Sequence, residues 1–130
     1  MPSTLTKQQI AAMKKELDER FVRAREEIRQ ALLKADNEQY TELAGRVHDP
    51  EEESVADLLV DVNLAAIDRH VQEIRDIDAS LLGIVDGTYG SCIDCESPIS
   101  YERLQAYPTA KRCHQCQTLY EKAKEKHPNL

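Results

Sequence analysis

The sequence predicts a mainly α-helical protein, in which a long antiparallel coiled-coil hairpin projects from a small four-cysteine zinc-finger module with a short C-terminal helix. Two long stretches have apolar residues at every third or fourth position, and two C-x2-C pairs follow them. The composition, with 32% charged residues, one Phe and no Trp, favours exposed helices over a large compact core. We expect residues 1–86 to form the hairpin, with its tip at about 45–54, and residues 87–130 to form the zinc module.

The first helix is expected to begin after Thr6 and to continue for about forty residues. Thr6 and Gln9 form a capping box ahead of an apolar run. Gly45 is the first breaker signal, so we expect one helix of roughly 55–60 Å. Its apolar face consists of Ile10, Met13, Leu17, Phe21, Ala24, Ile28, Ala31 and Ala35, with Leu43 and Val47 as a possible extension.

The second helix is expected to begin at Asp49-Pro50, because Asp is a good N-cap and Pro suits the first helical position. Ser54 offers a second possible cap slightly later, and Gly87 ends the pattern. Two helices of nearly matched length joined by a few residues predict an antiparallel hairpin, with its turn at roughly 45–53. The second apolar face consists of Val55, Leu59, Val62, Ala66, Ile67, Val71, Ile74, Ile77, Leu81 and Ile84.

The cysteines predict a metal site. Cys92 and Cys95 form one C-x2-C pair, Cys113 and Cys116 form another, and seventeen residues separate the pairs. Two residues between cysteines let one tight turn present both sulfurs to one ion, and four thiolates are a usual ligand set of Zn²⁺. We therefore expect these four residues, which are the only cysteines of the chain, to bind one Zn²⁺. A closed tetrahedral site has no position for a substrate, so the expected role is structural.

Other chemistry is open to two C-x2-C pairs. They could form disulfides, hold a rubredoxin-like iron or act as in thioredoxin, but the sequence has no sign of secretion, no partner cofactor and no βαβ pattern. His114, between the last two cysteines, is expected to remain outside the ligand set because four thiols are available. The spacer, with Pro98 and Pro108, has room for two short strands or for a turn and a helix.

The net charge of −7 is concentrated in the middle of the chain, where residues 36–61 contain nine acids and one base, Arg46. This pattern argues against nucleic-acid binding, because the phosphate backbone requires clustered Lys and Arg. The sequence has no apolar leader segment and no run of about 18 apolar residues, so we expect a cytoplasmic protein without a membrane span. A hairpin that buries its own seam needs no partner helix, which favours a monomer.

The zinc region resembles the DksA/TraR zinc-finger family. The shared residues are G-T-Y-G-x-C-x-x-C, then Ile99, Arg103-Leu104, Ala106, Pro108, Ala110 and C-x-x-C-Q, and the resemblance extends over the preceding hairpin. It implies a bacterial, non-enzymatic factor that binds RNA polymerase and does not bind DNA by sequence. In this family the hairpin enters the secondary channel and its tip acts near the catalytic Mg²⁺. One departure is Glu96, where the family commonly has a Gly that tolerates a positive φ.

The family's tip motif, Asp-x-x-Asp-x-Ala, falls here on Asp49, Glu52 and Ser54. The resemblance therefore implies that Asp49 and Glu52 are the polymerase-modulating tip residues and that Ser54 modulates them. Asp49 is kept, Glu52 retains the charge with one more methylene, and Ser54 replaces a methyl group by a hydroxyl group. We expect binding to survive while the regulatory effect weakens or changes.

The resemblance also concerns ppGpp, the ligand of the stringent response, which binds basic residues in other family members. This chain matches at Arg69 but has Asp76, Tyr107 and Gln117 at the other positions where a base is expected. A highly charged anion beside Asp76 would be repelled and would lose charge-assisted hydrogen bonds. We expect ppGpp binding to be weak or absent.

Three other functions remain open. The zinc site could be a redox sensor whose oxidation releases the metal, because every four-cysteine site is oxidisable. The tip carboxylates could recruit a Mg²⁺ for transcript cleavage, or the chain could be a coiled-coil adaptor for an unrelated partner.

His48, beside Asp49, could titrate near neutral pH but is expected to be a solvated loop residue.

Overall fold

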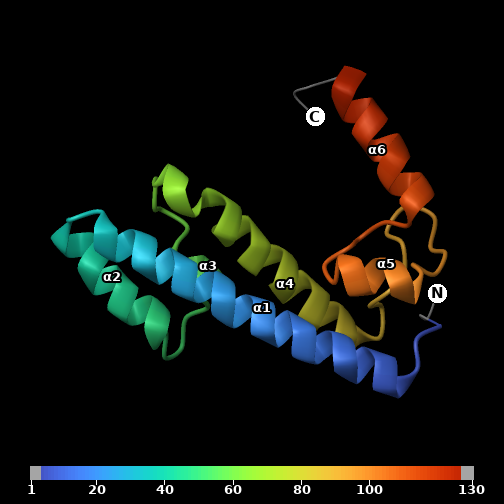
Figure 1. Ribbon diagram of the computed structural model, residues 1–130, viewed down its shortest axis with the longest axis horizontal. Helices are drawn as coiled ribbons and strands as arrows, with labels where there is room; N and C mark the ends of the chain where they lie inside the picture. Colours follow the sequence, from blue (N-terminus) through green and yellow to red (C-terminus); the bar gives the residue numbers. More distant parts are fainter. Residues whose placement is uncertain (1–3, 127–130) are drawn as a thin grey trace. The chain divides into compact units, whose positions relative to one another are not determined.

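The computed structural model describes residues 4–126 and is mainly helical, as predicted, with no strand among these residues. The chain divides into two compact units, one formed by residues 17–79 and the other by the residues before and after that stretch. The helices are α1 Lys7–Lys34, α2 Glu38–His48, α3 Val55–Leu58, the 3-10 helix η1 Ala65–Ile67, α4 Asp68–Asp86, α5 Tyr101–Ala106 and α6 His114–Lys126 (Figure 1).

The predicted capping box at the start of α1 is confirmed. The Thr6 N–H donates to Gln9 Oε1 and the Gln9 N–H donates to Thr6 Oγ1, both at 3.0 Å. These bonds satisfy two of the backbone N–H groups that a helix start leaves without an intrahelical partner.

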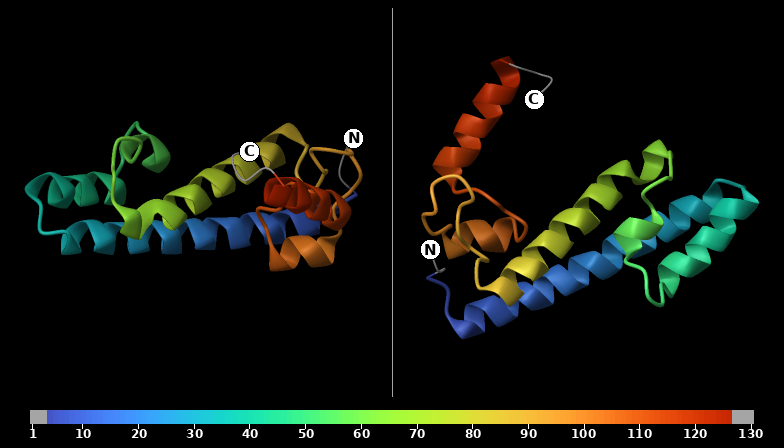
Figure 2. Two further views of the ribbon diagram at one scale, coloured as in Figure 1. Left: turned by 90° about the horizontal axis from the view of Figure 1, so that it is seen from above. Right: turned by 180° about the vertical axis from the view of Figure 1, so that it is seen from behind.

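The prediction of one uninterrupted first helix as far as Gly45 is wrong, because α1 ends at Lys34. Asp36 has a φ of 50°, a left-handed conformation that an α-helix cannot contain and that Asp tolerates better than most residues. The Asn37 side chain then accepts hydrogen bonds from the backbone N–H groups of Gln39 and Tyr40 and starts α2. The chain reverses at this point, and α2 lies antiparallel to α1 (Figures 1 and 2).

The second predicted helix is also interrupted. Ser54, the later of the two proposed caps, accepts from the Asp57 N–H at 3.0 Å and starts α3, whereas Asp49 is the C-cap of α2. The residues between α3 and η1 are not helical, although the apolar period continues through them. The middle of this segment, VDVN at residues 60–63, consists of β-branched residues, Asp and Asn, which have a low helix propensity. The expected turn at 45–53 is thus limited to the loop after α2, because Gly45 lies inside that helix.

One hydrophobic core holds the unit formed by residues 17–79. α1, α2, α3, η1 and α4 all contribute to it, which explains why the interrupted helices keep one apolar period. Its buried members are Ala24, Ile28, Leu32, Ala44, Val47, Val55, Leu59, Ile67, Val71 and Ile74. Several are fully buried aliphatic side chains, each of which stabilises the fold by about 1.5–3 kcal/mol relative to an exposed position.

The direction of α2 determines where the acidic loop lies within this unit. With eleven residues, α2 carries the chain about 16 Å back along α1 from the Asp36-Asn37 connection. The loop of residues 49–54 is therefore at the returning end of α2, and the α1–α2 connection is at the opposite end of that helix (Figure 1).

α4 ends as the sequence predicts. Gly87 has a φ of 80° and follows the last helical residue. The Thr88 N–H donates to Gly83 O at 2.8 Å, and the Gly87 N–H donates to Ile84 O at 3.4 Å. This pair of bonds is the Schellman arrangement, which turns the chain out of the helix and into the cysteine region.

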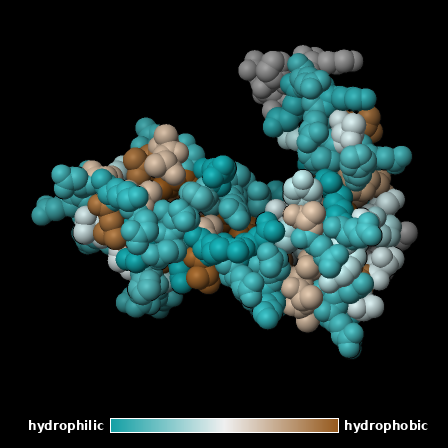
Figure 3. Space-filling view, viewed as in Figure 1, coloured by the Kyte–Doolittle hydropathy of each residue, from teal (hydrophilic) through white to brown (hydrophobic). Residues whose placement is uncertain are grey.

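Among the described residues, no helix combines the length and the apolar character needed to cross a membrane. On the face shown in Figure 3 the surface is mainly hydrophilic, and hydrophobic side chains occur in separate spots.

Candidate metal centre

The first cysteine pair lies on a tight turn that its own backbone closes. The Cys92 N–H donates to Ser97 O at 2.9 Å, and the Glu96 N–H donates to Cys92 O at 3.0 Å. Glu96 has a φ of 62°, so the position where the family commonly has Gly does require a left-handed residue. The turn places Cys92 in a buried position and leaves Cys95 exposed.

The second pair lies where a loop becomes α6. The Ile93 N–H donates to Lys111 O at 2.9 Å, which joins this loop to the first turn. The Gln117 N–H donates to Cys113 O at 2.9 Å, so Cys113 directly precedes the helix and Cys116 lies in its first turn. The spacer contains a turn and the short helix α5, one of the two arrangements that the sequence allowed. A single β-bridge joins Pro98 of the spacer to Ser91, directly before the first cysteine.

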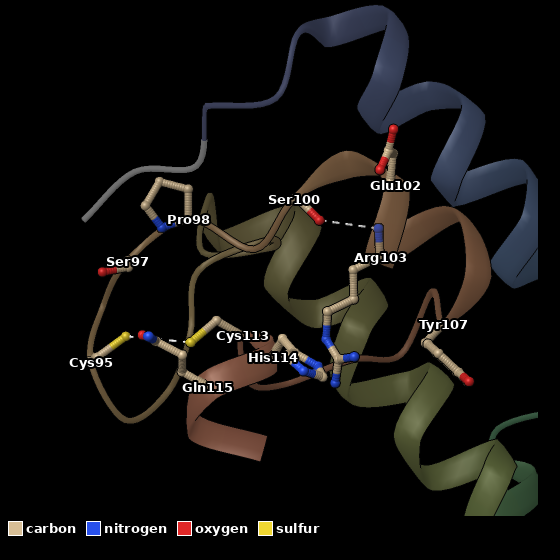
Figure 4. A pocket seen from close by; sticks show the side chains of 10 residues that line it. All are labelled: Cys95, Ser97, Pro98, Ser100, Glu102, Arg103, Tyr107, Cys113, His114 and Gln115. Carbon is tan, nitrogen blue, oxygen red and sulfur yellow. Dashed lines mark hydrogen bonds between the residues drawn. The ribbon is translucent and has the colours of Figure 1, made fainter. Parts of the chain in front are cut away.

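The four sulfurs lie at the distances that a zinc site requires. The Sγ atoms of Cys92, Cys95, Cys113 and Cys116 are all within 4.8 Å of one another. The Cys95 and Cys113 Sγ atoms, which Figure 4 shows, are 3.8 Å apart. Thiolates bound tetrahedrally at about 2.3 Å have neighbouring sulfurs at about 3.8 Å, whereas a disulfide requires about 2.05 Å. The four residues therefore fit one structural Zn²⁺, and all four cysteines are free of disulfides.

The turns also supply hydrogen bonds that favour thiolates. Burial by itself would raise the pKa of Cys92, but backbone N–H groups of Cys95, Cys113 and Asp94 outweigh it and lower this pKa to about 6. The side chain and the backbone of Ser97 lower the pKa of Cys95. The pKa of Cys116 is raised because its thiol shares hydrogen bonds with Cys113 and Cys95. Zn²⁺ binds thiolates, so metal binding requires these thiols to lose their protons.

A small core supports the two turns. Tyr89, Ile99, Leu104 and Pro108 are buried in it. The Tyr89 hydroxyl donates to Pro108 O at 2.8 Å, which links the residue ahead of the first pair to the spacer. Ser100 starts α5 by accepting from the Arg103 N–H at 3.2 Å.

An open hollow of about 600 Å³ lies beside the cysteines, lined by residues of both turns and of α5 (Figure 4). The Arg103 side chain extends into it from α5; its Nε donates to Arg112 O at 3.1 Å and its guanidinium lies 5.6 Å from the centre of the Tyr107 ring. His114 also lines the hollow and does not belong to the group of potential metal ligands.

The acidic loop after α2 has a different character. Asp49 and Glu52 are exposed, and the Asp49 N–H donates to Gly45 O at 3.1 Å as part of the helix end. The Glu53 carboxylate pairs with Arg46 at 2.7 Å, and Ser54 Oγ is occupied as the cap of α3. Among residues 4–126 the four cysteines are the one group of three or more potential ligands within reach of a common ion, so these carboxylates form no comparable magnesium site.

Three residues around the metal centre, Asp94, Arg112 and Tyr120, were not predicted from the sequence. Arg112 Nε donates to Asp94 Oδ2 at 2.8 Å, and the Arg112 guanidinium carbon lies 3.9 Å from the centre of the Tyr120 ring. An available signal was the position of an acid between the first two cysteines and of a base directly before the third. The aromatic partner had no comparable signal.

Comparison with known proteins finds similarity to one family of bacterial zinc-finger proteins. A family model described as the prokaryotic dksA/traR C4-type zinc finger matches residues 87–122. The RNA polymerase-binding transcription factor DksA of Caulobacter vibrioides is 30% identical over 95 residues, which are 73% of this chain and 62% of that protein. The protein of the same name from Escherichia coli is 32% identical over 78 residues, or 60% and 52% of the two chains. The chain thus spans less than two thirds of the length of these curated relatives.

A solved structure is also similar. The solution structure of the DnaK suppressor protein from Agrobacterium tumefaciens C58 matches with a TM-score of 0.50 and 29% identity, over 85% of this chain and 92% of that one.

Proposed function

We propose that this chain is a member of the DksA/TraR C4-type zinc-finger family, whose model matches residues 87–122, and that it is a transcription regulator that binds bacterial RNA polymerase. The observation that carries the proposal is the four-cysteine centre, which has the family's motif and a sulfur arrangement suited to one Zn²⁺. Relatives that share this module are named RNA polymerase-binding transcription factors. The function is regulatory and not enzymatic, and it is exerted in the cytoplasm, where the polymerase works.

The mode of action that we propose is entry into the secondary channel of the polymerase, with the acidic loop near the active site. Asp49 and Glu52 are the working residues, because both are exposed carboxylates, Asp49 as the C-cap of α2 and Glu52 in the loop that follows. The Arg46–Glu53 ion pair and the Ser54 cap support this role, since they join the loop to α2 on one side and to α3 on the other. A carboxylate on an anchored loop loses less conformational entropy on binding than one on a free loop.

The fold adds a specific requirement to this proposal. The Asp36-Asn37 connection lies at the other end of α2 from the acidic loop. If α2 keeps this position when the loop binds, the polymerase must also have room for the connection. A partner that admits the loop as the leading part of a simple two-helix hairpin would instead require α1 and α2 to straighten into one helix. Localised cleavage of the bound protein distinguishes a folded α1–α2 pair from a straightened helix.

The test is binding to core RNA polymerase, combined with cleavage by Fe²⁺ placed at the active-site Mg²⁺ position. Cleavage centred on residues 49–54 is expected if the loop leads, and cleavage centred on residues 35–38 if the connection leads. Asp49→Asn and Glu52→Gln are expected to weaken the regulatory effect on transcription. Glu42→Gln is the matched control, because it removes one exposed charge from α2 outside the loop.

Three outcomes contradict parts of the proposal. No binding at micromolar concentration by zinc-loaded protein overturns the polymerase assignment and favours the adaptor or redox-sensor hypothesis. Binding without cleavage of either segment overturns the secondary-channel mode. Equal loss of regulation in Glu42→Gln and in the two loop variants would mean that net charge, and not the loop, is responsible.

The effect is proposed to be independent of ppGpp. Asp76 lies on α4 and accepts from Gln72 Nε2 at 3.1 Å, and Gln117 donates to Glu121 at 3.0 Å, so neither presents a positive charge to an anion. The protein is proposed to act as a monomer. Transcription assays with and without ppGpp, and sedimentation of the free protein, test these two points.

A further inference from the structure

No buried apolar face holds α6 in its orientation. None of the side chains at positions 114–125 is buried, and Leu119, on the second turn, is 65% exposed. A surface helix normally keeps its position by burying an apolar face, and this one buries none. The first turn is held by the Gln117 N–H bond to Cys113 O and by Cys116 as a proposed metal ligand. Beyond that turn, another contact must set the direction.

The Arg112 side chain makes that contact. Arg112 directly precedes Cys113, and its side chain is 18% exposed. Its Nε donates to Asp94 Oδ2 at 2.8 Å, and Asp94 lies on the first turn, between Cys92 and Cys95. Its guanidinium carbon lies 3.9 Å from the centre of the Tyr120 ring, one helical turn beyond Cys116.

The chemistry of a guanidinium group suits this double role. Its edge can donate to a carboxylate while its flat face stacks on an aromatic ring, and a lysine ammonium cannot do both with one planar group. Lys124 also lies near the Tyr120 ring, at 5.4 Å from its centre, but has no link to the cysteine turns. Arg112 is further anchored through its carbonyl, which accepts from Arg103 Nε at 3.1 Å.

We infer that Arg112 is a positioning residue that fixes α6 against the cysteine turns by joining Asp94 to Tyr120. Without this bridge, the zinc-bound first turn of α6 stays in place and the helix beyond it becomes free to pivot. The bridge is therefore a device separate from metal binding. It sets the direction in which α6 presents its exposed lysines to a partner.

The test uses zinc-loaded, ¹⁵N-labelled full-length protein and measures backbone order along α6 by NMR relaxation. In Arg112→Gln, order parameters at residues 118–126 are expected to fall from about 0.85 to below about 0.6, the values of rigid and flexible backbone. Arg112→Lys keeps the charge, but its order parameters are expected to fall nearly as far, because an ammonium group cannot replace the planar guanidinium that stacks on the ring. Lys122→Gln is the matched control, since it removes one charge from an exposed position of α6.

Two further variants separate the two halves of the bridge. Tyr120→Leu removes the stacked ring and leaves the Asp94 pair, so α6 should loosen while the zinc content stays at one ion per chain. Tyr120→Phe keeps the ring and is expected to behave like the parent. Asp94→Asn should loosen α6 less than Arg112→Gln, because the stack remains.

Unchanged order along α6 in both Arg112→Gln and Tyr120→Leu, with zinc retained, would overturn the inference. Loss of zinc in Tyr120→Leu would also overturn it, because the residue would then support the metal site and not the helix. A separate measurement rests on the proposed function: Arg112→Gln should weaken polymerase binding by about tenfold, equivalent to about 1.4 kcal/mol. If the relaxation results hold and this binding loss is absent, the positioning role stands and α6 is no part of the polymerase contact.

Discussion

Tyr89 shows how one hydrogen bond supports the cysteine turns. Its hydroxyl donates to Pro108 O at 2.8 Å in a buried position. Tyr89→Phe leaves that carbonyl oxygen without this donor, so we expect a loss of about 1–2 kcal/mol in the free energy of unfolding of the zinc-loaded protein. Urea unfolding measures the loss. Tyr107→Phe, at a residue that is 61% exposed, is the control and should change stability little. Equal effects of the two variants would contradict the assignment.

The same residue predicts a dependence on alkaline pH. Burial, with a smaller contribution from Tyr101, raises the pKa of Tyr89 to about 12. An unfolded tyrosine has a pKa of about 10, so between the two values the unfolded chain releases a proton that the folded chain keeps. The stability contributed by neutral Tyr89 is thus present below pH of about 10 and is lost as the pH rises toward about 12. Between pH of about 10 and about 12, the free energy of unfolding should fall more steeply with pH for the parent than for Tyr89→Phe. Urea unfolding at a series of pH values measures this slope.

Glu96 is a residue at odds with its backbone. Its φ of 62° is a left-handed conformation that costs a non-glycine residue about 1 kcal/mol or more. Glu96→Gly should stabilise the zinc module by about 0.5–1 kcal/mol, after allowance for the greater flexibility of unfolded glycine. Thermal unfolding of the zinc-loaded protein measures the gain. Glu96→Ala keeps the strained backbone, so a gain of the same size in this variant would show that the lost charge is responsible.

At the scale of the element, the sequence predicted the ends of the helical region better than its interior. The Thr6–Gln9 box and the stop at Gly87 depend on local hydrogen bonds that short motifs specify. The breaks after Lys34 and after Leu58 were missed because apolar residues on both sides of each break enter one core, and the period therefore continues. Asp36-Asn37 was the available signal, since both residues favour left-handed and capping positions.

Variants at Ser54 test whether this position has Ser because of helix capping or because of function. The resemblance to the DksA/TraR family implies an Ala at this position, but here the Ser54 hydroxyl accepts from the Asp57 N–H at 3.0 Å. Ser54→Ala should therefore lower stability by about 1 kcal/mol, the usual cost of losing an N-cap. Ser54→Asp retains an acceptor and should unfold at nearly the parent's urea concentration. If Ser54→Ala is as stable as the parent, the cap contributes nothing and the functional role gains weight.

At the scale of the whole molecule, the metal centre was the most predictable feature. Its ligands depend on C-x2-C spacing, which short-range geometry fixes, and the four sulfurs meet as expected. The Asp94–Arg112 pair had a signal in its positions beside the cysteines, but the stacking of Arg112 on Tyr120 was not predictable, because it forms only after both turns and α6 are in place. The role of the acidic loop remains a prediction, since its position on a partner depends on surfaces outside the chain.

The division into two units predicts a partial response to zinc removal. The core of residues 17–79 has no cysteine, whereas the module around α5 and α6 has only a small core and depends on ligands from two loops. Structural zinc contributes about 10–16 kcal/mol to the folding of small fingers, so chelation should unfold this module alone. We expect a modest loss of helical ellipticity, because α5 and α6 contain a minority of the helical residues.

NMR provides the decisive measurement for this last prediction. After chelation, the methyl signals of Ile28 and Ile74, which are fully buried in the 17–79 unit, should keep their dispersed positions, while those of Ile99 and Leu104 should collapse to unfolded values. Cys113→Ser, which removes one ligand, should reproduce this pattern without a chelator. Collapse of all four signals together would mean that the two units fold as one, and the helical core would then depend on the metal that its own residues do not bind.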